Sequence, residues 1–319
     1  MNNENKPLLL VLGANPSWQK TLLFEKFIPG KVNRANHESC YASGKGINLC
    51  RAAHCSNLAD TQLFQFAGGD NGRKLCSKLD EAGFLHQTVW TDAETRSCIT
   101  CLTPDGTMTE LIGVSHPVLP DEASLILEYL KKSLSEFADR KLILVIAGSL
   151  PDGSDPDIYV KAVSLAVSNG VPVLVDALAG IEKILSLQGR IILKVNAEEF
   201  CKIIGCADIV EAHKKAASRY PGKIFAVTNG GEKALLSDGE SLYTYILPEI
   251  SAVSPLGAGD TAAAVMSALY AQGETVREAF KNALAAASAN CLSVTAGEYS
   301  IAEYQSILSG IIMQKYSLE

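Results

Sequence analysis

The chain has 319 residues, of which 47% are hydrophobic and 20% are charged, and its net charge at pH 7 is −7. This composition suits one large α/β domain with a small appendage and excludes a disordered chain. The negative charge argues against a nucleic-acid or anionic-membrane partner, and no apolar run approaches the ~20 residues of a membrane span. The polar start, followed by the short apolar run Leu8–Leu12, lacks a signal-peptide pattern, so we expect a cytoplasmic protein.

Short apolar runs alternate with segments of helical periodicity along most of the chain. The runs predict strands at Leu8–Leu12, Leu63–Phe66, Leu142–Ile146, Val171–Val175, Ile191–Val195 and Ile224–Thr228. The periodic segments predict helices at Asn48–Leu58, Gly72–Ala82, Pro156–Ser168 and Glu211–Arg219. Such alternation predicts a three-layer α/β/α fold with a mostly parallel central sheet, in which ligands bind beyond the carboxyl ends of the strands.

Two segments, at about 18–38 and 96–114, interrupt this alternation. The first is extended around the turn Pro29-Gly30, and the second is a hairpin around Pro104-Asp105-Gly106. They predict a small β-sheet lid on a single domain that spans residues 1–319. A lid of this kind can keep water from a reaction site, and its exposed edge strands favour a homodimer.

The strongest motif is Gly257-Ala258-Gly259-Asp260, which precedes an apolar helical pattern over Ala262–Tyr270. Its small residues let the backbone approach a ligand, and the helix start offers unpaired N–H groups to a phosphoryl group. Asp260, in the first turn, is stabilised as an anion and can accept a proton from an attacking hydroxyl. The alternative is an ordinary helix N-terminus at which Asp260 complements the helix dipole.

A second glycine-rich loop, Ser43-Gly44-Lys45-Gly46-Ile47-Asn48, opens another helix. Its spacing differs from a Walker A sequence. Lys45 can meet a phosphate, and Asn48 can both donate to and accept from sugar hydroxyls. The alternative is a tight turn that carries a solvated lysine.

Three further loops follow predicted strands. Ser149 lies in the first, and the segment Thr228-Asn229-Gly230 in the third suits nucleotide phosphates. In the second, Asn196 and Glu199 can orient the water ligands of a magnesium ion. The same spacing is equally typical of a helix-capping box, so both interpretations stand.

Taken in this order, the motifs resemble the ribokinase-like carbohydrate kinases of the phosphofructokinase B family, from Asn15-Pro16 to the alanine-rich helix at Ala283–Asn290. Within the family the likeness is greatest to 1-phosphofructokinases and tagatose-6-phosphate kinases. The resemblance implies that Asp260 is the catalytic base and that the amides from Gly257 through Ala258 and Gly259 to Asp260 form the anion hole. It also implies that ATP with Mg²⁺ is the co-substrate.

The resemblance further assigns binding residues. Those for the sugar and its phosphate are Gln19, Lys31, Gly44, Lys45, Asn48, Arg96 and Ser149. Those for ATP are Lys194, Thr228, Gly230, Gly257 and Gly259, and those for magnesium, through water, are Asn196 and Glu199. The chain departs from the family at Gln19, where an aspartate is usual, and at Ser43, where a glycine is common. It also departs at Ser254-Pro255, which leaves activation by a monovalent cation open.

The function expected from this resemblance is ATP-dependent phosphorylation of a hexose monophosphate, first of all fructose 1-phosphate to fructose 1,6-bisphosphate. Lys31, Lys45 and Arg96 favour a phosphorylated sugar, because three converging cations would be poorly compensated by a neutral one. Tagatose 6-phosphate or fructose 6-phosphate comes second, followed by an unphosphorylated sugar or a nucleoside. An alternative of another class is a non-catalytic regulatory protein that binds sugar phosphates on a kinase scaffold. Asp260 and the metal motif argue against it, since a pure binder needs neither.

Overall fold

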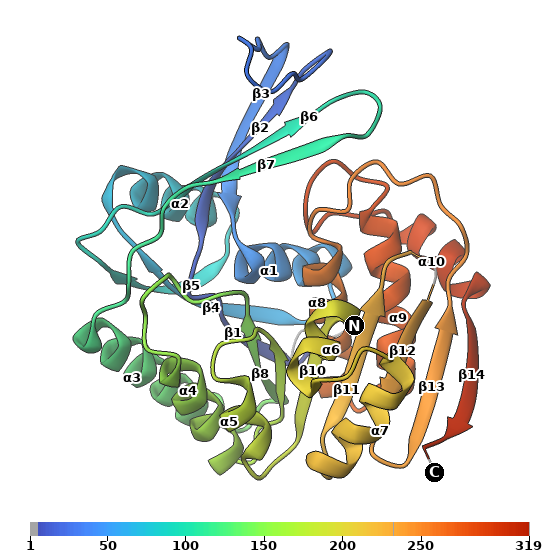
Figure 1. The fold of residues 1–319 in the computed structure, drawn as a ribbon. Helices are drawn as coiled ribbons and strands as arrows, with labels where there is room; N and C mark the ends of the chain where they lie inside the picture. The colour runs from blue at the N-terminus through green and yellow to red at the C-terminus, as the bar shows by residue number, and fades with distance from the viewer. Residues whose placement is uncertain (1–5, 232, 319) are drawn as a thin grey trace.

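A computed structural model describes residues 6–231 and 233–318, and the polar start at residues 1–5 lies outside them. Its main sheet has the order β14-β13-β12-β11-β10-β9-β8-β1-β4-β5 (Figure 1). The parallel strands are β1 (Leu8–Leu12), β4 (Asp60–Ala67), β5 (Leu85–Trp90), β8 (Leu142–Ala147), β9 (Val173–Asp176), β10 (Ile191–Asn196) and β11 (Ile224–Asn229). The antiparallel extension consists of β12 (Lys233–Ser237), β13 (Ser241–Ile246) and β14 (Ile312–Ser317).

Helices cover both faces of this sheet. One face carries α1 (Lys45–Ser56), α2 (Gly69–Glu81), α8 (Ala258–Gln272), α9 (Val276–Asn290) and α10 (Ile301–Gly310). The other carries α3 (Pro120–Glu136), α4 (Asp157–Ser168), α5 (Ile181–Ser186), α6 (Ala197–Ile204) and α7 (Ile209–Arg219). In β1, Leu9 and Val11 belong to the first core and Leu10 to the second, as the two-residue repeat of a strand requires. The predicted three-layer architecture is therefore confirmed.

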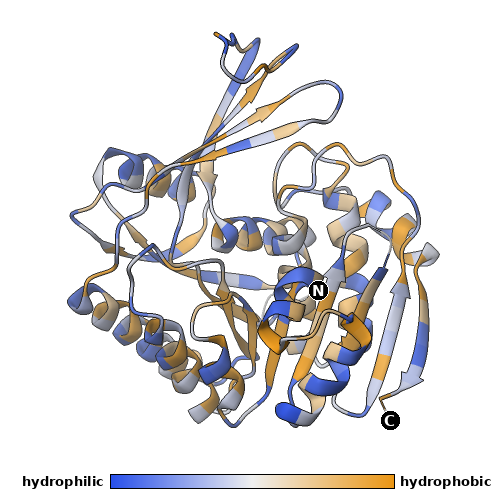
Figure 2. Ribbon diagram, viewed as in Figure 1, coloured by the Kyte–Doolittle hydropathy of each residue, from blue (hydrophilic) through white to orange (hydrophobic). Residues whose placement is uncertain are grey.

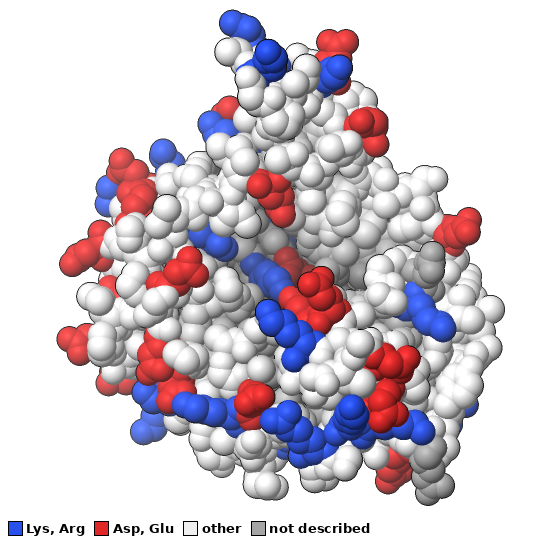
Figure 3. All heavy atoms as spheres, viewed as in Figure 1, with Lys and Arg blue, Asp and Glu red and all other residues white. Residues whose placement is uncertain are grey.

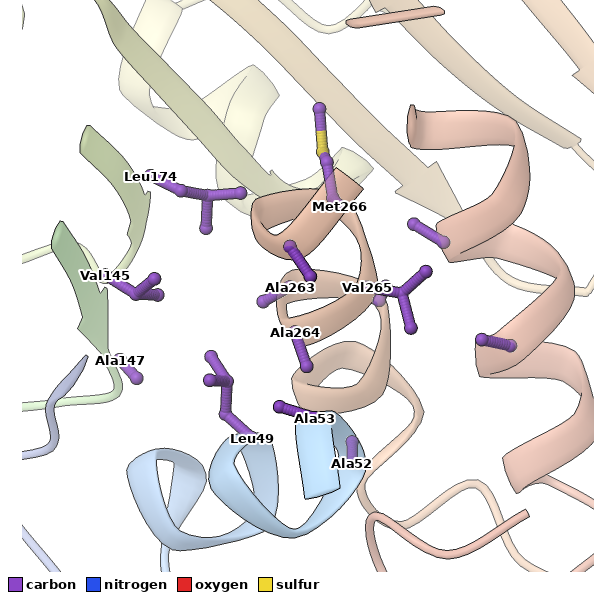
Figure 4. Close-up of a cluster of buried hydrophobic side chains, with 14 of the residues drawn as sticks. Leu49, Ala52, Ala53, Val145, Ala147, Leu174, Ala263, Ala264, Val265 and Met266 are labelled. Atoms are coloured by element: carbon purple, nitrogen blue, oxygen red, sulfur yellow. The ribbon is translucent and has the colours of Figure 1, made fainter. Parts of the chain in front are cut away.

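The core is apolar along the central strands, while the outer helix faces are hydrophilic (Figure 2). Small side chains in α8 let it pack closely against α1. Ala263 and Ala264 of α8 lie near Leu49 and Ala53 of α1, and all four are fully buried (Figure 4). Because both helices start at the carboxyl end of the parallel strands, this packing brings their first turns together.

A second sheet, in the order β3-β2-β6-β7, lies over that same end of the main sheet (Figure 1). It consists of β2 (Ser17–Leu23), β3 (His37–Ser43), β6 (Ser97–Leu102) and β7 (Met108–Ile112). We call it the lid sheet. The first predicted lid segment ended at residue 38, but β3 continues to Ser43 and leads directly into α1. In the parts of the chain that the structure describes, no helix is long and apolar enough to span a membrane.

Candidate active site

The predicted functional loops meet where the parallel strands end. Ser149 follows β8 by two residues, Asn196 ends β10, and Thr228 is the last residue but one of β11. Gly230, in the turn after β11, has φ +64°, a conformation that favours glycine. Figure 3 shows basic and acidic side chains gathered in a hollow below the lid sheet.

Asp260 is the third residue of α8, and only 6% of it is exposed. The helix starts after Gly257, whose φ is +81° and whose added Cβ would lie 2.7 Å from Cα of Ala296. Glycine is required there both for the conformation and for the space. Gly257 has no side chain to cap the helix, and the N–H of Ala258 donates to the carbonyl oxygen of Pro255 at 3.3 Å. The N–H groups of Gly259 and Asp260 also lie in the first turn, where a helix offers donors to an anion.

Burial raises the pKa of the Asp260 carboxyl to about 6. The charge of Lys45 opposes this rise, and the neighbouring Asp176 carboxylate adds to it. Nδ2 of Asn48 donates a hydrogen bond of 2.8 Å to Oδ2 of Asp260 and favours the anion. A carboxyl group with a pKa near neutrality is suited to proton transfer, because it can accept a proton at physiological pH.

Next to Asp260, the carboxylate of Asp176 pairs with two lysines. Oδ1 lies 2.9 Å from Nζ of Lys45, and Oδ2 lies 2.7 Å from Nζ of Lys194. Lys194 also donates to the carbonyl oxygen of Gly259, at 2.9 Å. Burial disfavours the Asp176 anion, but the two lysines outweigh burial and lower its pKa. Burial likewise opposes the charge of Lys45, whose pKa is nevertheless raised by the carboxylates of Asp176 and Asp260.

Asn48 is placed by the loop that precedes α1. Gly44 has φ +116°, and a Cβ there would lie 2.8 Å from Cα of Pro16, so the loop needs a glycine at this position. The hydroxyl of Ser43 donates to Oδ1 of Asn48 at 3.2 Å. The serine that stands in place of the family's common glycine thus fixes one side of the Asn48 amide.

Asn196 and Glu199 form a complete capping box at the start of α6. The N–H of Glu199 donates to Oδ1 of Asn196 at 2.8 Å, and Oε2 of Glu199 accepts from the N–H of Asn196 at 3.0 Å. Among residues 6–231 and 233–318 no group of three or more His, Cys, Asp or Glu side chains could hold a metal by itself. Glu199 does line a cavity of about 470 Å³ that Lys45 and Asp176 also line. Asp152 lines the same cavity, and such scattered carboxylates fit a magnesium ion that is held mainly by substrate phosphates and water.

Asn15 links Arg96 to Ser149, because it forms a hydrogen bond with each of them. The guanidinium of Arg96 donates to the carbonyl oxygen of Asn15 at 2.9 Å, and Nδ2 of Asn15 donates to Oγ of Ser149 at 3.4 Å. Arg96 also donates to the carbonyl oxygen of Pro16, at 3.4 Å. Arg96 is half-buried and Ser149 is exposed, so both can be reached by a ligand.

The two candidate substrate-binding residues of the lid segment, Gln19 and Lys31, differ in burial and in position. Gln19 is 5% exposed, and its Nε2 donates to Oγ1 of Thr100 at 2.8 Å, so the side chain does not point into solvent. Lys31 is exposed and lies in the connection between β2 and β3, at the end of the lid sheet away from α1 and α8 (Figure 1). In the single chain Lys31 is therefore not brought together with Lys45 and Arg96.

Sequence reasoning missed two residues of this site, Asp176 and Arg51. Asp176 directly follows the predicted strand Val171–Val175, the same signal that singled out the other loops. Arg51 lies one helical turn after Asn48 on α1, and its guanidinium donates to Oδ1 of Asn48 at 3.1 Å. The three-residue spacing from Asn48, which makes the two side chains neighbours on a helix, is the sequence signal that could have identified Arg51.

The geometry thus consists of a three-layer α/β/α fold with a separate lid sheet and a buried carboxyl group, that of Asp260, at a glycine-rich helix start. The sequence model of the pfkB family carbohydrate kinases matches residues 19–302, and the chain belongs to that family. It is a sugar kinase by family membership.

Solved structures show the same fold. Phosphofructokinase-2 from Escherichia coli, in complex with potassium, has a TM-score of 0.84 at 23% identity, over 95% of this chain and 98% of that chain. The same enzyme in complex with fructose-6-phosphate has a TM-score of 0.82 at 22% identity, over 95% and 98% of the two chains. A Thermotoga maritima protein named as a possible 1-phosphofructokinase has a TM-score of 0.83 at 20% identity, over 97% and 100%.

Proposed function

We propose that this kinase transfers the γ-phosphoryl group of ATP to a hydroxyl of a hexose monophosphate, with Asp260 as the general base. The observation that carries the proposal is the buried Asp260 carboxyl at the start of α8, with a pKa of about 6 and a hydrogen bond from Asn48. A pure binding protein has no use for a carboxyl tuned to take up a proton near neutral pH.

In the proposed reaction, Asp260 accepts the proton of the attacking sugar hydroxyl. The hydroxyl oxygen forms a bond to the γ-phosphorus, and the bond from that phosphorus to the bridging oxygen of ADP breaks. The N–H groups at the segment Gly257 to Asp260 would stabilise the charge on the phosphoryl oxygens, once that of Ala258 turns from Pro255 to the phosphate, with Lys45 and Lys194 nearby. When magnesium is bound it neutralises phosphate charge, and Asn196 and Glu199 would orient its water ligands.

The proposed acceptor is fructose 1-phosphate, with fructose 6-phosphate or tagatose 6-phosphate as the second candidate. Arg96 and Ser149 near the mouth of the site would contact the existing phosphate, together with Lys45. Gln19 and Asn48, with Gly44, would contact the sugar. The resemblance in fold to a phosphofructokinase-2 that was solved with fructose-6-phosphate favours the second candidate.

Four further features belong to the same proposal. Thr228 and Gly230 would contact the ATP phosphates from the turn after β11. A monovalent cation is a candidate ligand, since a phosphofructokinase-2 of the same fold was solved in complex with potassium, while Ser254-Pro255 departs from the family at the segment before the anion hole. The lid sheet would pair two copies in a homodimer, through which Lys31 would approach a phosphate. We place the protein in the cytoplasm.

The experiment is an ADP-release assay with ATP, Mg²⁺ and a panel of acceptors: fructose 1-phosphate, fructose 6-phosphate, tagatose 6-phosphate and free fructose. We expect the highest kcat/KM for a phosphorylated ketohexose. A preference for free fructose would refute the proposed phosphate site, and no turnover with any sugar phosphate would refute the proposed function.

A further inference from the structure

Arg51 makes contacts that no step of the proposed reaction uses. It lies on α1, one turn after Asn48, and is half-buried. Nη1 donates to Oδ1 of Asn48 at 3.1 Å and to the carbonyl oxygen of Ala296 at 2.8 Å, and Nη2 donates to the carbonyl oxygen of Ala42 at 2.7 Å. One guanidinium thus joins α1 to the end of β3, nine residues before Arg51, and to the segment at Ala296, which is 245 residues away in the sequence.

The first consequence concerns the orientation of the Asn48 amide. A guanidinium carries donors only, so the Asn48 atom that faces Arg51 has to be the carbonyl oxygen Oδ1. With Oδ1 also accepting from Ser43, the Nδ2 group is directed to the other side, where it donates to Oδ2 of Asp260 at 2.8 Å. A flipped amide would instead set an acceptor against the Asp260 carboxylate and lose this hydrogen bond.

The second consequence concerns the segment that backs the start of α8. An added Cβ on Gly297 would lie 2.5 Å from the carbonyl oxygen of Asn48, and one on Gly257 would lie 2.7 Å from Cα of Ala296. Ala296 and Gly297 are therefore packed tightly between α1 and the start of α8. The bond from Arg51 to Ala296 fixes this segment against α1, and the bond to Ala42 fixes the end of lid strand β3 to the same helix.

We propose that Arg51 is a positioning residue of this kinase: it selects the orientation of the Asn48 amide and thereby the placement of the Asp260 carboxylate. This inference rests on the proposed function. Arg51 is not a catalytic residue, because its effect passes through Asn48 and the segment at Ala296.

The test compares Arg51→Met, which removes every donor, with Arg51→Lys, which keeps one donating group. Arg73→Met serves as the matched control, because Arg73 is an exposed arginine on α2 that forms an ion pair with Asp70, three residues earlier on the same helix. We expect kcat of Arg51→Met to fall roughly 10-fold to 100-fold, the range that a small misplacement of a reacting group can cause. Arg51→Lys should retain an intermediate kcat, and KM for ATP should stay near the wild-type value in both variants.

A double-mutant cycle with Asn48→Ala tests whether the effect passes through the amide. If it does, Arg51→Met added to Asn48→Ala lowers kcat no further, because the two residues act as a unit. Additive losses would overturn the inference, as would an unchanged kcat in Arg51→Met. A melting temperature and a KM for ATP that worsen together with kcat in Arg51→Lys would show a general structural role and also overturn it. If the wild type itself turns over no sugar phosphate, the proposed function fails and this inference fails with it.

Discussion

Asp176 and Lys194 form an ion pair of 2.7 Å in which both residues are almost fully buried, 3% and 4% exposed. The pair lies close to Asp260, because Lys194 also donates to the carbonyl oxygen of Gly259, the residue before Asp260 in the chain. The start of α8 thus contacts a charge pair whose two members come from the neighbouring strands β9 and β10.

Asp176→Asn should lower the free energy of unfolding by about 3–5 kcal/mol, the usual cost of leaving one partner of a buried ion pair unpaired. The matched control is Asp157→Asn, since Asp157 pairs with Lys183 at the surface, where the loss should stay below ~1 kcal/mol. Urea unfolding at pH 7 measures the free energy of unfolding of both variants. Equal losses of stability would show that the buried ion pair stabilises the fold no more than the surface pair does.

The pH dependence of turnover should report the pKa of Asp260. Because the base works as a carboxylate and its pKa is raised to about 6, kcat/KM should fall as pH drops below about 6, with a limiting slope of about tenfold per pH unit. An aspartate with its ordinary pKa would leave the rate flat down to about pH 4. A pH–rate profile from pH 8 to pH 5, with circular dichroism to verify folding, distinguishes the two.

His213 should make stability depend on pH. It is fully buried, its ring lies 4.7 Å from that of Phe200, and burial lowers its pKa from 6.5 to about 4. Below pH 6.5 the unfolded chain takes up a proton that the folded chain does not, so stability falls as pH falls from about 6.5 toward 4. Between pH 7 and pH 5 this contribution amounts to roughly 2 kcal/mol.

The control for this effect is His213→Gln, which does not titrate and can still bond Ser237, the present partner of Nδ1 at 2.8 Å. Urea unfolding at pH 7 and pH 5 should show a smaller loss in the variant than in the wild type. The same loss in both would assign the acid sensitivity to other groups.

Gln19→Asp should change the selectivity among ketohexose phosphates. A carboxylate accepts more strongly than an amide but donates nothing, so one hydrogen bond to the sugar would be exchanged, worth about 1–2 kcal/mol in the ratio of two kcat/KM values. The amide of Gln19 now donates to Thr100, which keeps the side chain inside the lid sheet. If the ratio of kcat/KM for fructose 1-phosphate to that for fructose 6-phosphate stays unchanged, the side chain at position 19 does not contribute to sugar selectivity.

The parallel part of the fold could be predicted because each buried strand is a short apolar run between helical patterns. The predicted Leu8–Leu12 matches β1 residue for residue. Strand β14 could not be predicted, since most of its residues are exposed and its place depends on pairing with β13. Helix α3 begins at Pro120, in a segment where the strand–helix pattern gave no prediction.

The site was only partly predictable, because some of its contacts join residues that are far apart in the sequence. A glycine-rich helix start marks Asp260 locally, but the Lys45–Asp176 contact joins residues 131 apart in sequence. The residues next to Asp176 in the sequence do not indicate that Lys45 and Lys194 both pair with it. At Asn196 and Glu199 the capping interpretation is present in the structure as two hydrogen bonds, and the magnesium role stays a proposal.

The most direct test of the account is the turnover of Asp260→Asn with ATP, Mg²⁺ and fructose 1-phosphate, beside Asp139→Asn as an exposed control. The amide is nearly the same shape but cannot take the proton, so kcat should fall by about 10²–10⁴-fold. Calorimetry should show that ATP and sugar phosphate still bind, and Asp139→Asn should turn over like the wild type. A kcat of Asp260→Asn close to the wild-type value would contradict the assignment of Asp260 as the base.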